Sequence, residues 1–165
     1  MGNSVDEPLV MIEDIEQLIS SAVTEVFSTM LNLKVRLDAS CNAMVNGEGH
    51  VAGSVGFIGR VSGVVFLYST NSFARRMTSS LLGLTDLEIE GDEMVNDAMG
   101  ELSNMVVGHI KSRLSDRGMP CVLTIPSIVR GNHFTIEPVS STERRIFFFN
   151  CDGRQLVVEV LLKGT

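Results

Sequence analysis

Helix-type and strand-type patterns lie in separate blocks along this chain of 165 residues, and that separation limits the folds it can adopt. Apolar residues recur every three or four positions from Leu9 to about Leu31, which predicts one long amphipathic helix. A β-rich block follows, then a second helical block, then a β-rich C-terminal third. Because helices and strands do not alternate one by one, the pattern does not suit a parallel α/β sheet, and we predict the α+β class.

Seven segments carry strand signals. Period-two alternation, β-branched residues and turn signals predict three strands in the first β-rich block, at 34–40, 51–58 and 61–69. The C-terminal third carries four more: "CVLTIPSIVRG" at 121–131, "HFTIEPV" at 133–139, "RRIFFFNC" at 144–151 and "QLVVEVLLK" at 155–163. The Asp152–Gly153 pair between the last two segments predicts a tight hairpin turn.

Two helices are predicted in the middle of the chain. "STNSFARRMTSSLLG" begins with hydroxyl-bearing caps and stops at Gly83, which is typical of a short helix. A second long helix runs from about Asp92 to Asp116, with Gly118 and Pro120 just past its end. No segment resembles a linker, so we predict a single domain over residues 1–165, with residues 1–7 disordered.

Charge and hydropathy weigh against two classes of partner. The formal charge is −7 and the 13 basic residues are scattered, whereas a nucleic-acid site needs clustered cations. A basic or mixed-charge protein partner fits better. No uncharged apolar run approaches the roughly 18 residues of a membrane span, and the N-terminus lacks a secretory pattern. We therefore expect a cytoplasmic protein that binds neither nucleic acid nor membrane.

The chain shows no self-contained catalytic or metal site. Its three cysteines are far apart and form no CxxC pair, so we expect reduced core thiols: Cys41, Cys121 and Cys151. His50 and His133 fall in predicted β edges or turns, and His109 falls on the buried side of the second long helix. Because no histidine is placed beside a nucleophile, a hydrolase that works with its own residues alone is not indicated.

The second long helix has a polar stripe. At about 100° per residue, one side gathers the expected core positions: Val95, Ala98, Met99, Leu102, Met105, Val106, His109, Ile110 and Arg113. The opposite side gathers Asp97, Glu101, Asn104 and Gly108, with Gly100 and Val107 along one edge. We predict that these six residues form an exposed surface.

Three interpretations of this stripe are open from the residues alone. A polar outer face is what any amphipathic helix has. Paired carboxylates one turn apart could serve acid–base chemistry or hold a cation, but one convex helix leaves most of the cation's oxygen shell to water. A docking surface is the third, because Gly100, Asn104 and Gly108 are poor helix formers, each glycine costing about 1 kcal/mol relative to alanine.

At this stripe the sequence resembles the CheX and CheC family of bacterial chemotaxis phosphatases, which is related to phosphatase-type flagellar switch proteins. The family signature is Asp or Ser, Glu four residues later, Asn three residues after that, and a distant Pro. Here it is Asp97, Glu101 and Asn104 in "DAMGELSN", with Pro126 in "LTIPSIV". CheC-like members carry the motif on two helices, whereas "SFARRMTSSLLG" has neither Glu nor Asn. That departure favours the single-site CheX branch.

The resemblance implies a fold and an assembly. The fold would be a two-layer α/β sandwich with long helices on a mainly antiparallel sheet. The protein would be a homodimer. The run of three phenylalanines in "RRIFFFNC" agrees with pairing through a β edge, since an apolar edge strand invites another chain.

The resemblance also implies a function. The substrate would be the aspartyl phosphate of a CheY-like response regulator, which supplies its own Mg²⁺, so this chain needs no metal or cofactor. Asn104 would hold the attacking water and Glu101 would pair with the regulator's active-site Lys. Asp97, Gly100, Val107 and Gly108 would contact the partner. Two rivals remain: a non-catalytic binding module of the same fold for a regulator or flagellar-motor component, and a small-ligand domain with a large apolar pocket elsewhere.

Overall fold

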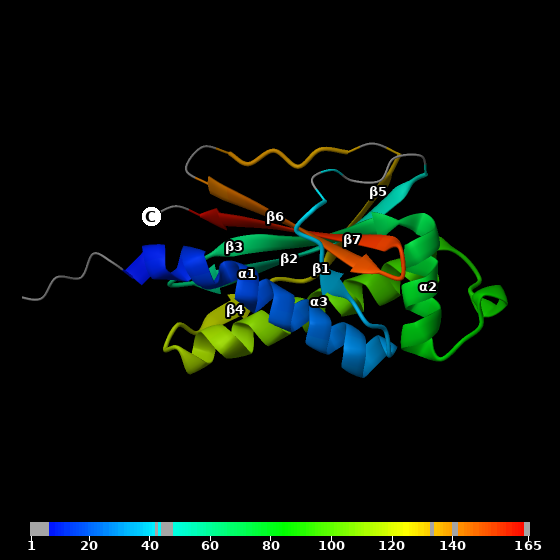
Figure 1. Cartoon of the computed structure of the whole chain (residues 1–165), viewed down its shortest axis with the longest axis horizontal. Helices are drawn as coiled ribbons and strands as arrows, with labels where there is room; N and C mark the ends of the chain where they lie inside the picture. Colours follow the sequence, from blue (N-terminus) through cyan, green and yellow to red (C-terminus); the bar gives the residue numbers. More distant parts are fainter. Residues whose placement is uncertain (1–6, 42, 44–47, 133, 140–141, 164–165) are drawn as a thin grey trace, which may run out of the picture.

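The computed structural model describes residues 7–41, 43, 48–132, 134–139 and 142–163, and the side chains from residue 14 onward within these ranges. Figure 1 shows their elements in chain order. The first half contains α1 Glu7–Val26, η1 Phe27–Leu31, β1 Arg36–Leu37, β2 His50–Gly59, β3 Gly63–Thr70 and α2 Asn71–Leu82. The second half contains η2 Asp86–Glu88, α3 Asp92–Asp116, β4 Cys121–Leu123, β5 Ser127–Gly131, β6 Thr142–Cys151 and β7 Arg154–Lys163.

The strands form one antiparallel sheet in the order β1-β6-β7-β3-β2-β4, and β5 pairs with β2 further along the same edge. This order has an internal two-fold symmetry. β1 corresponds to β4 with β5, β6 corresponds to β2, and β7 corresponds to β3. The long helix α1 precedes β1 as the long helix α3 precedes β4. The two halves therefore share one topology.

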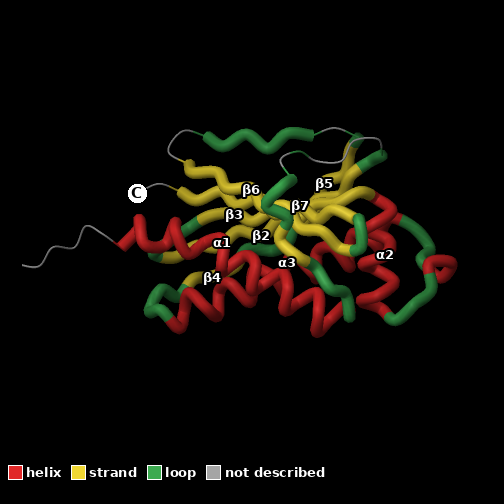
Figure 2. Tube along the Cα trace, in the orientation of Figure 1, coloured by secondary structure: helices red, strands yellow, loops and turns green. Residues whose placement is uncertain are grey.

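The helices lie on one face of the sheet. In Figures 1 and 2, α1 and α3 run side by side beneath the strands, with α2 at one end. Residues 134–139 cross the other face, where Phe134 and Ile136 pack on a small cluster around Tyr68 and Val157. The α+β class and the helix-on-sheet arrangement are confirmed. Among the described residues, no helix is long and apolar enough to cross a membrane.

α3 lies directly on β2 because β2 has no side chain at Gly53. A methyl group at Gly53 would lie only 2.2 Å from Ser103 Oγ and 3.1 Å from the carbonyl oxygen of Met99. The Ser103 hydroxyl donates to that same carbonyl, at 2.7 Å, and is buried. Gly53 therefore sets how closely α3 approaches the sheet.

The predicted turn between the last two strands is confirmed. Asp152 has φ of 49° and Gly153 has φ of 81°, so both central residues adopt the left-handed conformation. Two such residues define the hairpin turn whose twist matches that of the flanking strands. Cys151 then pairs with Arg154 at the start of the β6–β7 ladder.

The other face of the sheet contains a buried carboxylate. Glu159 is 1% exposed, accepts from the Tyr68 hydroxyl at 3.1 Å, and pairs with Arg144 on β6. Burial is the main cause that raises the pKa of Tyr68, and the negative charge of Glu159 is the second. The phenol therefore stays protonated and continues to donate to the carboxylate.

Three sequence predictions about strands and termini need correction. The predicted strand 121–131 is divided into β4 and β5, because Thr124 bonds Gly56 through both its amide nitrogen (2.9 Å) and its hydroxyl (2.8 Å), and Pro126 has no N–H to donate. Residues 134–139 form no strand, and His133 lies outside the described residues. α1 begins at Glu7, within the segment predicted to be disordered, while residues 1–6 are also outside the described ranges.

The cysteine prediction is confirmed only in part. Cys121 and Cys151 are buried free thiols, and burial raises the pKa of both. Cys41 is only partly buried, and its sulfur accepts from the Gln155 amide at 2.9 Å. It lies four residues after the end of the short strand β1.

Candidate functional site

The polar stripe of α3 lies partly in solvent, as expected. Asp97 and Glu101 are exposed, and Asn104 and Gly108 are half-buried. Most of the opposite side is buried in the core, including Met99, Leu102 and Val106. The helical period therefore separates the two sides correctly for these positions.

Two residues predicted on the stripe are buried instead. Val107 is 1% exposed and belongs to the hydrophobic core, so the expectation that it lies on an exposed surface is wrong. Gly100 is also buried, beneath β5. The physical reason is that α3 has two covered flanks, one against the sheet and one against α1 and α2. Arg113 differs in the opposite direction, being exposed although it was predicted on the core side.

An open hollow of about 360 Å³ lies between α3 and the edge of the sheet. We call it the α3 hollow, and its lining residues are Asn96, Asp97, Gly100, Glu101, Asn104, Pro126 and Ile128. Pro126 and Ile128 form one wall, since a methyl group at Gly100 would lie 3.7 Å from Pro126 Cβ and 3.9 Å from Ile128 Cδ1. The fold thus brings Pro126 beside the three signature residues of α3.

The functional groups of the α3 hollow are free to bind another molecule. Within the described part of the chain, the side chains of Asp97, Glu101 and Asn104 make no hydrogen bond or ion pair. The hollow therefore offers two carboxylates as acceptors and one amide that can both donate and accept. Within the same ranges, no group of three or more His, Cys, Asp or Glu side chains is placed to hold a metal ion.

Arg130 on β5 supports the wall of the α3 hollow. Its Nε donates to Asn96 Oδ1 at 2.5 Å and its Nη1 donates to Asn71 Oδ1 at 3.0 Å. Its Nη2 donates to the carbonyl oxygen of Asp92 at 3.3 Å. One guanidinium therefore joins β5 to the first turns of both α3 and α2.

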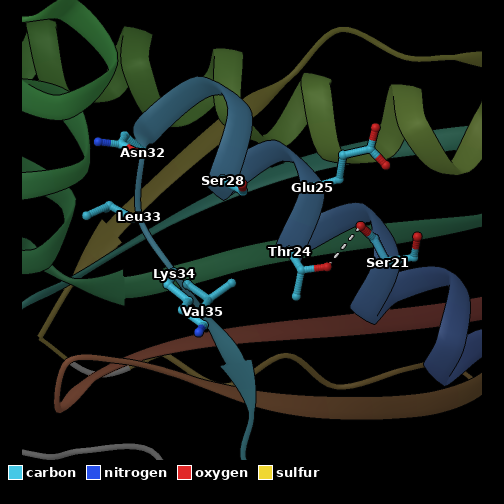
Figure 3. A pocket seen from close by; sticks show the side chains of 8 residues that line it. All are labelled: Ser21, Thr24, Glu25, Ser28, Asn32, Leu33, Lys34 and Val35. Carbon is cyan, nitrogen blue, oxygen red and sulfur yellow. Dashed lines mark hydrogen bonds between the residues drawn. The ribbon is translucent and has the colours of Figure 1, made fainter.

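A larger hollow of about 520 Å³ lies along the C-terminal part of α1. Figure 3 shows this α1 hollow, whose lining residues are Ser21, Thr24, Glu25, Ser28, Asn32, Leu33, Lys34 and Val35. Its side chains are mainly polar, so it is not the large apolar pocket expected of a small-ligand domain. Two of its groups already have neighbours within the chain: a Glu25 carboxylate oxygen lies 3.3 Å from His109 Nε2, and the Thr24 hydroxyl donates to the Ser20 carbonyl oxygen at 2.7 Å.

Sequence reasoning missed Asn96, Ile128 and Arg130. A weak signal existed for Ile128, because it lies two residues after Pro126 within the predicted strand 121–131 and would share its face there. Asn96 and Arg130 carried no such signal, since 34 residues separate them in sequence and only the fold brings them together.

Comparison with known proteins agrees with the motif. Residues 51–150 match the family described as "Chemotaxis phosphatase CheX". No curated protein matches the chain. Crystal structures of similar fold include a CheX from Desulfovibrio desulfuricans, with 25% identity, TM-score 0.76, and 91% of this chain and 99% of that chain covered. A CheC-like protein from Shewanella sp. PV-4 has 26% identity and TM-score 0.74, over 92% and 98% of the two chains.

A third similar structure is a complex. It contains CheX and CheY with BeF₃ and Mg²⁺ from Borrelia burgdorferi. The likeness has 21% identity and TM-score 0.72, and it covers 90% of this chain and 97% of that chain. At this identity it supports the fold.

Proposed function

The chain belongs to the CheX family of chemotaxis phosphatases, and on that premise we propose that it hydrolyses the aspartyl phosphate of a CheY-like response regulator. The observation that carries this proposal is the α3 hollow. It gathers Asp97, Glu101 and Asn104 with Pro126 from a distant strand, and it leaves the three polar side chains without partners in the described chain.

Asn104 is the proposed catalytic group. Phosphoryl transfer requires mainly that a water be held in line with the leaving oxygen, so a well-placed amide can supply much of the rate. The Asn104 side chain can both donate to and accept from that water, and it adds no negative charge beside the phosphoryl group. Its half-buried position, beside the wall, limits its freedom and favours a fixed geometry.

Glu101 is the proposed docking group. It is exposed one helical turn from Asn104, so it can pair with the active-site lysine of the regulator and fix the position of α3 against it. Asp97 would add a supporting contact one turn earlier. Gly108 faces open space, because a methyl group there would meet no other atom within 4 Å. Without a side chain, it would let the backbone of the regulator approach α3 closely.

The metal ion is proposed to come with the substrate. The complex from Borrelia burgdorferi contains Mg²⁺ together with CheX and CheY, which supports this division of labour. The residues of this chain would then position water and partner, while the regulator would supply the phosphoryl group and the cation. A cytoplasmic location, expected from the sequence, stays a prediction.

Phosphate release tests the proposal. A purified CheY-like regulator is charged with acetyl phosphate, and phosphate is measured with and without this chain. We expect the chain to accelerate release severalfold at substoichiometric concentration. Binding of the charged regulator without acceleration would contradict the phosphatase proposal and would assign the non-catalytic binding role instead.

We also propose a homodimer formed through β6. Beyond its pairing with the two-residue strand β1, the outer edge of β6 from Thr142 to Phe147 has no strand beside it in the described chain. β5, which forms the wall of the α3 hollow, lies at the opposite edge of the sheet. Pairing through β6 would therefore leave both sites open. Light scattering that shows a monomer at micromolar concentration would contradict this assembly.

A further inference from the structure

The side chains of β5 face α3 in a regular order. Pro126, Ile128 and Arg130 are two residues apart, and Ile128 and Arg130 pair in register with Gly53 and Val51, which lie against the helical layer. Pro126 and Ile128 lie beside Gly100, whereas Arg130 bonds to α3 one and two turns earlier. The wall of the α3 hollow and the Arg130 contacts are therefore parts of one interface.

The planar guanidinium of Arg130 donates in three directions, and most of the side chain is buried. Its side chain is 24% exposed, and Nε, Nη1 and Nη2 each donate to a different residue. The acceptor of Nε, Asn96, is the residue before Asp97 and itself lines the α3 hollow. The bond to Asn96 restrains the rotation of this part of α3 about its axis, and so the direction in which the neighbouring Asp97, Glu101 and Asn104 point.

We infer that Arg130 is a positioning residue for phosphoryl-group hydrolysis, an inference that rests on the proposed function. Arg130 does not line the α3 hollow and touches no reacting atom. It holds α3 at a fixed rotation and distance from Pro126, so that Asn104 and Glu101 meet the partner in register. A reaction that depends on holding water in line is sensitive to this geometry.

Lysine cannot take the place of Arg130. Its ammonium is a compact charge at the end of a flexible stem, and it cannot direct donors to Asn96, Asn71 and the Asp92 carbonyl at once. Arg130→Lys therefore keeps the charge and removes the planar guanidinium. The variant separates positioning from simple electrostatics.

The experiment compares Arg130→Lys with two other variants. Asn96→Ala removes one acceptor and leaves the other two, which provides a milder change should Arg130→Lys fail to fold. Arg117→Gln is the matched control, because Arg117 pairs with Asp14 at 3.1 Å near the far end of α3. For each variant we measure kcat for dephosphorylation, the Kd for the beryllofluoride-activated regulator, and amide hydrogen exchange along α3.

Arg130→Lys is expected to lower kcat roughly tenfold or more, because a misplacement of about 1 Å can cost on the order of 100-fold in rate. Its Kd should change much less than kcat, and exchange should quicken for residues 96–104 but not for the C-terminal half of α3. Asn96→Ala should show the same pattern more weakly, and Arg117→Gln should leave kcat and exchange at 96–104 unchanged.

Two results would overturn the inference. One is a folded Arg130→Lys or Asn96→Ala variant with wild-type kcat. The other is a loss of kcat that only follows the loss of folded protein. A wild-type chain that does not accelerate dephosphorylation would contradict the proposed function itself, and this role with it.

Discussion

The two long helices occupy corresponding places in the symmetric order of the sheet, yet in the described part of the chain only α3 leaves all three polar side chains at this spacing without partners. α1 carries Ser21, Glu25 and Ser28 at the same spacing as Asp97, Glu101 and Asn104. On α1, however, Glu25 lies 3.3 Å from His109 and the Ser21 hydroxyl accepts from Arg113 at 3.4 Å. The spacing of polar residues on a helix therefore does not identify a site unless those residues are also free of partners within the chain.

The strands that follow the two helices differ as well. α1 leads into β1, which has only two residues. α3 leads into β4 and β5, which are separated by Thr124, Ile125 and Pro126, and Pro126 lies beside Gly100. In the α3 half, Pro126 and Ile128 therefore form a wall beside Asp97, Glu101 and Asn104.

The largest difference between the halves should appear when the third motif position is changed. Asn104→Ala should lower kcat at least about 100-fold, or about 2.7 kcal/mol of transition-state stabilisation, because the in-line water loses its support. Ser28→Ala at the corresponding position of α1 should leave kcat unchanged. Initial rates of phosphate release from the charged regulator measure both.

Asn104 and Ser28 are not core residues, so both variants are expected to fold. Circular dichroism checks this for each variant. A folded Asn104→Ala variant with most of its activity would remove Asn104 from the mechanism. A comparable loss in Ser28→Ala would show that the two halves are functionally alike, against the comparison drawn above.

The second motif position should give a smaller effect on binding. Glu101→Gln should weaken binding of the regulator roughly tenfold at low salt, about 1.4 kcal/mol, and less at high salt, because screening already weakens exposed charge pairs. Glu25→Gln should leave binding unchanged. Isothermal titration calorimetry at two salt concentrations measures the Kd of each variant for the regulator. A Kd of Glu101→Gln equal to that of wild type at both concentrations would assign Glu101 another role.

The two glycines of the stripe separate stability from activity. Gly100→Ala and Gly108→Ala should each stabilise α3 by up to about 1 kcal/mol through helix propensity, since the new methyl groups meet ordinary contacts or none. Gly100→Ala should also lower kcat a fewfold, because its methyl group enters the α3 hollow. Thermal unfolding and initial rates are measured together, and unchanged kcat in Gly100→Ala would show that the hollow tolerates filling.

The smallest effect is expected where the halves contact each other. His109→Gln removes the pairing with the half-exposed Glu25, and partly exposed ion pairs contribute only about 0–1 kcal/mol. We expect a change of less than about 1 kcal/mol in the free energy of unfolding and no change in kcat. Urea titration gives the first quantity. A clear loss of kcat would mean that α1 takes part in the reaction through His109.

The sequence predicted local structure well wherever local chemistry determines it. The bounds of α3, from Asp92 to Asp116, agree with the prediction, and Asp152 with Gly153 forms the expected turn. Both depend on residues close together in sequence, namely terminators beyond a helix and a pair that tolerates positive φ. The same reasoning correctly predicted that the side chains of Asp97 and Glu101 are exposed to solvent.

Long-range packing explains what the sequence did not reveal. A single apolar face was assumed for α3, but the sheet covers one flank and α1 with α2 cover another, which buries Val107 and Gly100. The wall of the α3 hollow depends on a break in an edge strand, and that break depends on bonds between Thr124 and Gly56. No local pattern contains such information.

The break between β4 and β5 also has a consequence for how copies of the chain associate at high concentration. A sheet with two continuous free edges can add strands at both ends and polymerise into a fibre. Here one edge is divided into segments of three and five residues, with a proline between them that cannot donate a hydrogen bond. In the described chain the longer uninterrupted edge is that of β6. If copies associate through that one edge, the assembly closes as a pair.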